Sequence, residues 1–161
     1  GMTAGTDAMN DSVNTDLPGA FLEGQHRTID AGVQGFLGGT ATRDALAASL
    51  ALLREHIHAE EAVLFPPLAS AGLTMPVFVM KREHGQMWPL IERLATACDA
   101  ATAGDELRES CRELMMLLDI HNPKEEAILY PAADRHAGAD PAFMGALATA
   151  SPPEGWKCEF A

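Results

Sequence analysis

The sequence predicts an all-α protein: an up-down-up-down bundle of four long helices, followed by a short C-terminal helix and a tail. Apolar residues recur at alternating steps of three and four along four long stretches, which is the spacing of one buried helix face. Glycine-rich breaks separate the stretches, and the alternation and turn pairs that indicate strands and hairpins are absent. With 161 residues, 47% of them hydrophobic, the chain can bury the core of one such domain.

The first two predicted helices are separated by a Gly-Gly break. The first covers residues 17–37 and ends at Gly38-Gly39. The second begins near Thr42, whose hydroxyl can cap a helix N-terminus, and fades beyond Pro66-Pro67 toward Gly72. Because proline has no N–H to donate to the carbonyl four residues back, we expect this helix to bend or end at the prolines.

The remaining helices are predicted in the same way. Thr74 is expected to cap the third helix, which runs to about residue 103. The fourth covers residues 104–136, with a bend or an end at Pro131, and a short fifth helix is expected over residues 140–150.

The chain is expected to hold one folded domain, the bundle, over residues 17–150. Residues 1–16 are polar and without periodicity, which predicts a flexible lead-in, and they lack the basic start and apolar stretch of a signal peptide. Residues 151–161 form a tail with three apolar side chains, Trp156, Cys158 and Phe160. This tail should fold back on the bundle or contact another chain, so a homodimer formed through it is one expectation.

Charge and composition exclude several classes of function. The formal net charge of -12 argues against binding nucleic acid, which depends on cationic contacts to phosphates, and against anionic membrane surfaces. No stretch approaches the roughly 18 uninterrupted apolar residues of a membrane span. The expected location is therefore cytoplasmic.

A repeated motif carries the strongest functional signal. Residues 56–66, HIHAEEAVLFP, and residues 121–131, HNPKEEAILYP, share a His, Glu-Glu-Ala, a Leu, an aromatic residue and a Pro. Each copy places a carboxylate four residues after an imidazole, and that spacing puts both groups on one face of a helix. The pairs are His56 with Glu60, and His121 with Glu125.

Helix phase adds one histidine from each of the other two long helices. His26 lies on the apolar stripe of the first helix and His84 on that of the third, while the stripe of the fourth helix continues to Ile128. Antiparallel neighbours face each other at residues equidistant from their connecting turn. By this criterion, both histidines and both motif pairs fall in one layer of the bundle.

Such a layer predicts a metal site. Four imidazoles and two carboxylates buried without partners would cost several kcal/mol, roughly, for each charge, and a metal ion removes that cost. These donors suit iron, manganese or zinc, and bundle cores can hold dinuclear carboxylate sites. With both carboxylates bridging, the ligand set suits two ions, with room for an outside ligand. The predicted ligands are His26, His56, Glu60, His84, His121 and Glu125.

These motifs resemble hemerythrin-like proteins of the HHE cation-binding family. The pattern His26, His56-x-x-x-Glu60, His84, His121-x-x-x-Glu125 covers most of the chain, and the Leu-Phe-Pro and Leu-Tyr-Pro endings are also similar to that family. The resemblance implies a four-helix bundle around a non-haem di-iron centre. It implies that Glu60 and Glu125 bridge two iron ions and that the four histidines are terminal ligands.

The chain also departs from the oxygen carriers of that family. Those proteins have a further His one turn after the third-helix ligand, where this chain has Trp88, and a carboxylate five rather than four residues after the last His. One iron is then short of an imidazole, which favours reaction with peroxide over reversible oxygen binding. Four other side chains can be considered for the gap, although helix phase places them off the stripe: Glu61, Glu83, Glu126 and His58. Glu61 and Glu126 can instead orient a ligand imidazole.

Three functions are compatible with these observations. The leading one is a di-iron protein that binds or senses a small diatomic or peroxide ligand such as oxygen, nitric oxide or hydrogen peroxide, with iron storage or delivery as an extension implied by the resemblance. The second is a catalase-like or peroxidase-like enzyme, and the third is a metal-stabilised interaction module. A ferritin-like Glu-x-x-His pattern also occurs, at Glu23 with His26 and at Glu55 with His58. The second of these pairs points away from the stripe, so this alternative is disfavoured.

Overall fold

The computed structural model describes residues 17–100 and 104–161. All the regular secondary structure assigned in these two ranges is helical, which confirms the all-α prediction for the described part of the chain. The expected lead-in, residues 1–16, lies outside the described residues, as does the segment 101–103.

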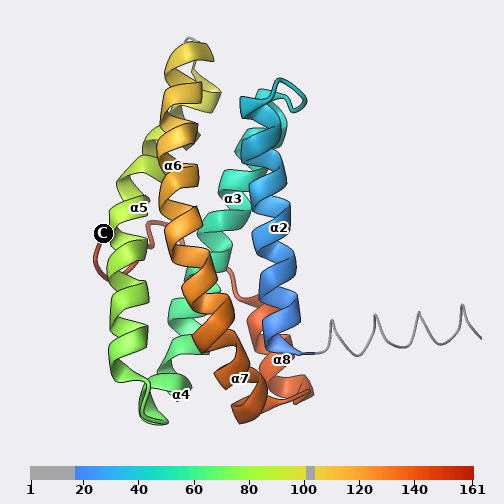
Figure 1. Cartoon of the computed structure of the whole chain (residues 1–161), viewed down its shortest axis with the longest axis vertical. Coiled ribbons are helices and arrows are strands. Elements are labelled where there is room, and N and C mark those ends of the chain that lie inside the picture. The colour runs from blue at the N-terminus through green and yellow to red at the C-terminus, as the bar shows by residue number, and fades with distance from the viewer. Residues whose placement is uncertain (1–16, 101–103) are drawn as a thin grey trace, which may run out of the picture.

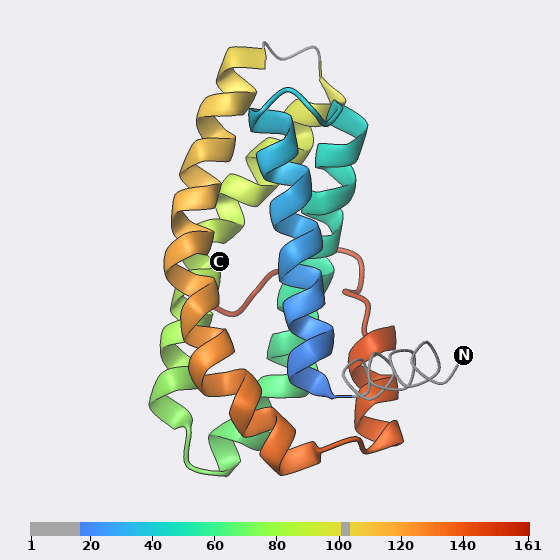
Figure 2. The ribbon, with the colours of Figure 1, turned by 45° about the vertical axis from the view of Figure 1, so that its right-hand side comes forward.

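Four long helical rods stand side by side and form the bundle (Figures 1 and 2). The first is α2 (Pro18–Leu37) and the third is α5 (Thr74–Asp99). The second rod is composite and consists of α3 (Arg43–Ala59), η1 (Glu60–Leu64) and α4 (Phe65–Ser70). The fourth is also composite and consists of α6 (Gly104–Lys124), η2 (Glu125–Leu129) and α7 (Tyr130–Ala137). A short helix, α8 (Pro141–Thr149), follows the fourth rod. The rods close into a ring, because α2 packs on α3 and α6, and α5 packs on the same two helices.

Of the two helix caps predicted from the sequence, one is present and the other is not. The Thr42 hydroxyl accepts a hydrogen bond from the Ala45 N–H at 3.1 Å, as predicted. The prediction that Thr74 caps the third helix is wrong, since Leu73 is the N-cap residue. The Thr74 hydroxyl instead donates to the Ala69 carbonyl at 3.3 Å, which ties the start of α5 to the end of the preceding rod.

Neither composite rod ends at its proline. In each, one π-helical turn stands directly before the aromatic-Pro pair, and the rod then continues to Ser70 or to Ala137. The N–H of Phe65 bonds to the carbonyl of Glu60, and the N–H of Tyr130 to the carbonyl of Glu125, in each case five residues back. A π turn is wider than an α turn, so the proline ring avoids the clash with a carbonyl four residues back.

The core has two apolar halves. One half fills the bundle around Leu50, Leu53 and Ile91, and the other lies toward α4 and α7 around Leu22, Phe65 and Leu129 (a set that includes Leu68, Met80 and Tyr130). The histidines and glutamates of the predicted layer lie at the level where these two halves meet. The layer is therefore covered by hydrocarbon on both sides along the bundle axis.

The tail folds back over its own bundle (Figure 2). Trp156 packs edge-on against Trp88, with ring centroids 5.4 Å apart, and Cys158 is buried. A Cβ added to Gly85 would lie 2.4 Å from the Phe160 carbonyl oxygen, so only glycine lets the tail approach α5 this closely. Fold-back is one of the two expectations for the tail; the homodimer stays a prediction. None of the described helices is long and apolar enough to cross a membrane.

The close contact between α2 and α3 gives a stability prediction. A Cβ on Gly32 would lie 1.7 Å from the Ser49 Oγ and 2.8 Å from its Cβ, so Gly32→Ala must move the two helices apart. We expect this substitution to lower the free energy of unfolding by about 1–3 kcal/mol. Gly24→Ala in the same helix meets nothing closer than 4.0 Å and should instead raise it by about 0.5–1 kcal/mol. Urea denaturation measures both, and equal stability of the two variants would contradict this packing.

Candidate metal centre

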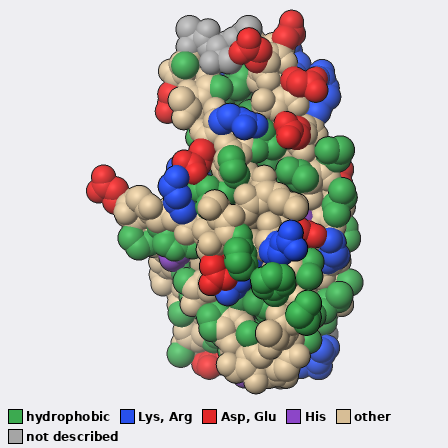
Figure 3. Space-filling view, turned by 90° about the vertical axis from the view of Figure 1, so that its left-hand side faces the viewer, with side chains coloured by type: hydrophobic (Ala, Val, Ile, Leu, Met, Phe, Trp, Pro, Cys, Tyr) green, Lys and Arg blue, Asp and Glu red, His purple; other side chains and the backbone are tan. Residues whose placement is uncertain are grey.

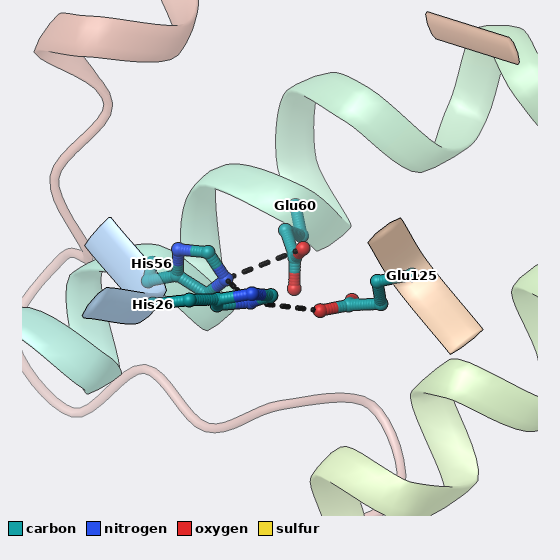
Figure 4. Close-up of side chains that lie close together, drawn as sticks. All are labelled: His26, His56, Glu60 and Glu125. Atoms are coloured by element: carbon teal, nitrogen blue, oxygen red, sulfur yellow. Dashed lines mark hydrogen bonds and ion pairs between the residues drawn. The ribbon is translucent and has the colours of Figure 1, made fainter. Parts of the chain in front are cut away.

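All six predicted ligand residues meet in the layer between the two apolar halves. Their side chains come from all four rods, and none is more than 3% exposed: His26, His56, Glu60, His84, His121 and Glu125. Figure 4 shows four of them, with the rings of His26 and His56 directed toward the carboxylates of Glu60 and Glu125. The structure therefore brings together groups that lie far apart in the sequence.

The six residues form two groups that share the carboxylates. His26 and His56 make the first position, and His84 and His121 make the second, each together with Glu60 and Glu125. Within a group, one potential donor atom from each residue lies within 4.8 Å of the others. Two positions with two common carboxylates are the arrangement of a dinuclear site.

Distances in the first position are short around the donor atoms. The Nε2 atoms of His26 and His56 are 3.1 Å apart. The His56 Nε2 is 3.3 Å from Glu60 Oε2, and the His26 Nε2 is 3.2 Å from Glu125 Oε1. These four atoms surround one point in the interior of the bundle.

The second position uses the same two carboxylates from the other side. The His84 Nε2 lies 3.1 Å from Glu60 Oε1 and 3.7 Å from Glu125 Oε2, and the His121 Nε2 lies 3.2 Å from Glu125 Oε1. Glu60 thus presents one oxygen to each position. This is how a carboxylate bridges two ions.

Unpartnered atoms show that the residues fit metal ions. Three fully buried atoms in the second position make no hydrogen bond of acceptable geometry, although two of them are 3.1 Å apart: Glu60 Oε1, His84 Nε2 and Glu125 Oε2. Buried polar atoms without partners cost free energy and are uncommon in folded proteins. A cation would satisfy all three, and imidazole with carboxylate is a donor set that suits iron, manganese or zinc.

The outer nitrogen of each of the four histidines in the two groups also has a hydrogen-bond partner. Glu126 Oε2 lies 2.9 Å from the His26 Nδ1, and Glu61 Oε2 lies 2.7 Å from the His84 Nδ1, so these two glutamates contact imidazoles as expected from the sequence. The Nδ1 of His56 contacts Gln25 Oε1 at 2.7 Å, and that of His121 contacts Glu83 Oε1 at 2.8 Å. In the neutral imidazole that binds a metal, such bonds keep the proton on Nδ1 and leave Nε2 free for the ion.

The residues that support the imidazoles are sequence neighbours of the predicted ligands and follow the internal repeat. The repeat therefore carries a signal for them that the helical period alone does not. The residue after each shared glutamate contacts a histidine of the other position: Glu61 contacts His84, and Glu126 contacts His26. The residues before His26 and His84, which are Gln25 and Glu83, contact His56 and His121. Two of the supporting residues, Glu61 and Glu83, accept further hydrogen bonds. Glu61 Oε1 accepts the backbone N–H of Glu159 in the tail at 3.0 Å, and Lys124 donates to Glu83.

Other residues weighed from the sequence lie outside both groups. Glu61, Glu83 and Glu126 face outer imidazole nitrogens rather than the metal positions. His58 packs against Trp156, with ring centroids 4.8 Å apart, and Glu55 is exposed. Trp88 is buried beneath the Arg54 guanidinium and belongs to neither group, and among the described residues no fifth imidazole joins the two groups.

Tyr130 is a site residue that helix phase did not find. In an α-helix, a residue five positions after Glu125 lies about 140° away around the axis. The π turn closes one turn over those five residues, so Tyr130 returns to the face of Glu125, and its hydroxyl donates to Glu60 Oε2 at 2.7 Å. The same turn moves Ile128 off the inner face, and the expectation that Ile128 points inward is wrong because it is 47% exposed.

The electrostatics of the centre favour protonated imidazoles beside the two carboxylates. Burial disfavours the charged form of His26, yet the carboxylates of Glu125, Glu60 and Glu126 outweigh burial and raise its pKa to about 9. Burial likewise opposes ionisation of Glu125, but His121, His26 and His84 hold the pKa of that carboxyl well below its usual range. For Tyr130, burial and the two carboxylates raise the phenol pKa well above its usual value. Metal binding here must displace protons from the imidazoles.

Comparison with known proteins agrees with this geometry. The family model of the hemerythrin HHE cation binding domain matches residues 17–133, a range that contains all six residues of the two groups. No curated protein and no solved structure matches the chain.

The raised histidine pKa values predict how stability depends on pH without metal. His26 titrates near 6.5 when unfolded and near 9 when folded, and the pKa values of His84 and His121 are also raised. The stabilisation is complete below pH 6.5 and is lost as the pH rises through 9. We therefore expect the metal-free protein to lose stability over this window, by at most about 1.4 kcal/mol per pH unit for each extra proton that the folded state holds.

Chemical denaturation at a series of pH values measures this dependence. The metal-loaded protein is the control, because ions replace the imidazole protons and should stabilise the fold more as the pH rises. Metal-free stability that increases from pH 6.5 to pH 9 would contradict the arrangement of charges described above.

Proposed function

The chain belongs to the hemerythrin HHE cation-binding family, and from this membership we propose that it is a non-haem di-iron protein that binds or senses small oxidants. One observation carries the proposal: Glu60 and Glu125 are shared between two buried histidine pairs. The two carboxylates and four imidazoles would hold two ions close together. Iron bound here would supply two electrons for reduction of an oxidant, one from each ion.

The surroundings of the centre support a small, neutral ligand. The donor side chains are at most 3% exposed, so a bulky or charged molecule has no direct approach. A groove of about 250 Å³ on the surface, lined almost entirely by apolar side chains, runs over α5 and η2 and includes Met80, Ile128 and Leu129. Met80 precedes His84 by one helical turn, which places the groove beside the second position. Figure 3 shows hydrophobic side chains gathered on the lower part of the α5 face.

A second candidate function is peroxide decomposition, and the second position favours it. There the chain offers two histidines and the shared carboxylates, and Trp88 stands where the oxygen carriers have a further imidazole. An ion held by fewer side chains has more positions for outside ligands. Such an ion exchanges ligands readily, which suits turnover more than storage of bound oxygen.

The test compares wild-type protein with Glu125→Ala, both loaded with iron(II) under nitrogen. Wild-type protein should bind two ions per chain and change its optical spectrum when oxygen, nitric oxide or peroxide is added. Glu125→Ala removes a shared ligand, so it should bind at most one ion and lose this response. Glu109→Ala is the matched control, because that glutamate is exposed and pairs only with Arg112 in the part of the chain that is described.

The form of the response separates the candidates. An absorption band that forms with oxygen and disappears under vacuum supports reversible binding. Steady evolution of oxygen from added peroxide supports the enzyme. Two bound ions with no optical response to any of the oxidants would contradict the proposed function, and two ions retained in Glu125→Ala would contradict the sharing of that carboxylate.

A further inference from the structure

The hydroxyl of Tyr130 lies among the donor atoms of the first position. Its oxygen is 2.7 Å from Glu60 Oε2, 3.0 Å from His26 Nε2, 3.2 Å from Glu125 Oε1 and 3.3 Å from His56 Nε2. These four residues are the whole of the first group, and Tyr130 is 1% exposed.

The distances are those of one more ligand. Donors about 2.1 Å from an ion occupy corners of an octahedron whose edges are about 3.0 Å long. The edge from His26 to His56 is 3.1 Å, and the edges from these rings to the carboxylates are 3.3 and 3.2 Å. The Tyr130 oxygen lies at a similar distance, 2.7–3.3 Å, from all four donors. It therefore stands where a fifth corner would stand; an ion itself would lie about 2.1 Å from each donor.

The other half of the repeat has no such oxygen. Phe65 is the counterpart of Tyr130 in the first motif, and its ring stacks on His84 with centroids 5.7 Å apart and planes 16° apart. The unpartnered donor atoms belong to this half. The two positions thus share the same carboxylates and the same number of imidazoles but differ by one oxygen donor.

The supporting residues differ in the same direction. His56 rests on the neutral amide of Gln25, whereas His121 rests on the carboxylate of Glu83, whose charge Lys124 partly offsets. The first position therefore has one supporting carboxylate fewer than the second, so its supports repel an anionic ligand less. The second has an apolar ring in the equivalent place.

We propose that the phenol oxygen of Tyr130 is a fifth protein ligand at the His26–His56 position, so that the two ions of the centre are inequivalent. When the ion binds, the O–H bond breaks, an oxygen–metal bond forms and the proton leaves to solvent, with no change in oxidation state. The ion at the His84–His121 position is then the one with more places open to outside ligands. This inference rests on the di-metal centre proposed above.

The chain contains a single tyrosine, which makes the test direct. Iron(III)-loaded wild-type protein should show a visible phenolate-to-iron charge-transfer band, and resonance Raman excitation in that band should enhance the ring modes of a tyrosinate. Tyr130→Phe should abolish both signals and still bind two irons, because the six other ligands remain. Phe65 shows that a phenylalanine is accommodated at the equivalent place. Zinc-loaded wild-type protein is the control and should show no such band, since zinc is redox-inactive.

Iron content measured on the same samples separates the two proposals. Two irons per wild-type chain without tyrosinate modes would overturn the role of Tyr130 and leave the di-metal centre standing. The same visible band in Tyr130→Phe would also overturn it. Fewer than two irons in wild-type protein would overturn the di-metal centre, and with it the fifth ligand.

Discussion

Glu60 and Glu125 place two carboxylates at the centre of an apolar bundle, with no exposure to solvent. The arrangement of the surrounding side chains depends on the need to compensate these two charges. Charges so deep in a protein are unstable unless opposite charges or metal ions lie beside them. Each of the four rods supplies one histidine for this purpose, and each histidine is fixed from behind by a side chain of another rod. Without metal, protonated imidazoles offset the charge of the carboxylates, but three buried atoms of the second position still make no hydrogen bond of acceptable geometry.

The two halves of the bundle are alike in ligands and unlike in what surrounds them. The repeat supplies two imidazoles to each position and one shared carboxylate from each motif. The differences lie at the edge of this pattern, where Tyr130 is paired with Phe65 and Gln25 with Glu83. With Tyr130 as a ligand, as proposed, such a centre would hold one ion by more side chains than the other and leave the second ion open to a small oxidant.

Much of the fold and the six central residues were predictable from the sequence, because up to Glu60 and Glu125 the rods are ordinary α-helices in which a four-residue spacing keeps side chains on one face. The prediction failed where the period changes. The π turn after Glu125 brings Tyr130 inward and turns Ile128 outward, and no α-helical period reproduces that shift. Gln25 was missed for a different reason: it lies off the apolar stripe, and its contact with His56 depends on how two helices pack.

Anomalous diffraction at the iron absorption edge, from crystals of the iron-loaded protein, tests the central claim most directly. We expect two peaks per chain, about 3.5–4 Å apart as in other two-metal sites. One peak should lie beside His26 and His56 and the other beside His84 and His121, with both carboxylates reaching each. A single peak, or peaks away from the layer that these residues form, would contradict the shared-carboxylate centre on which this account of the protein depends.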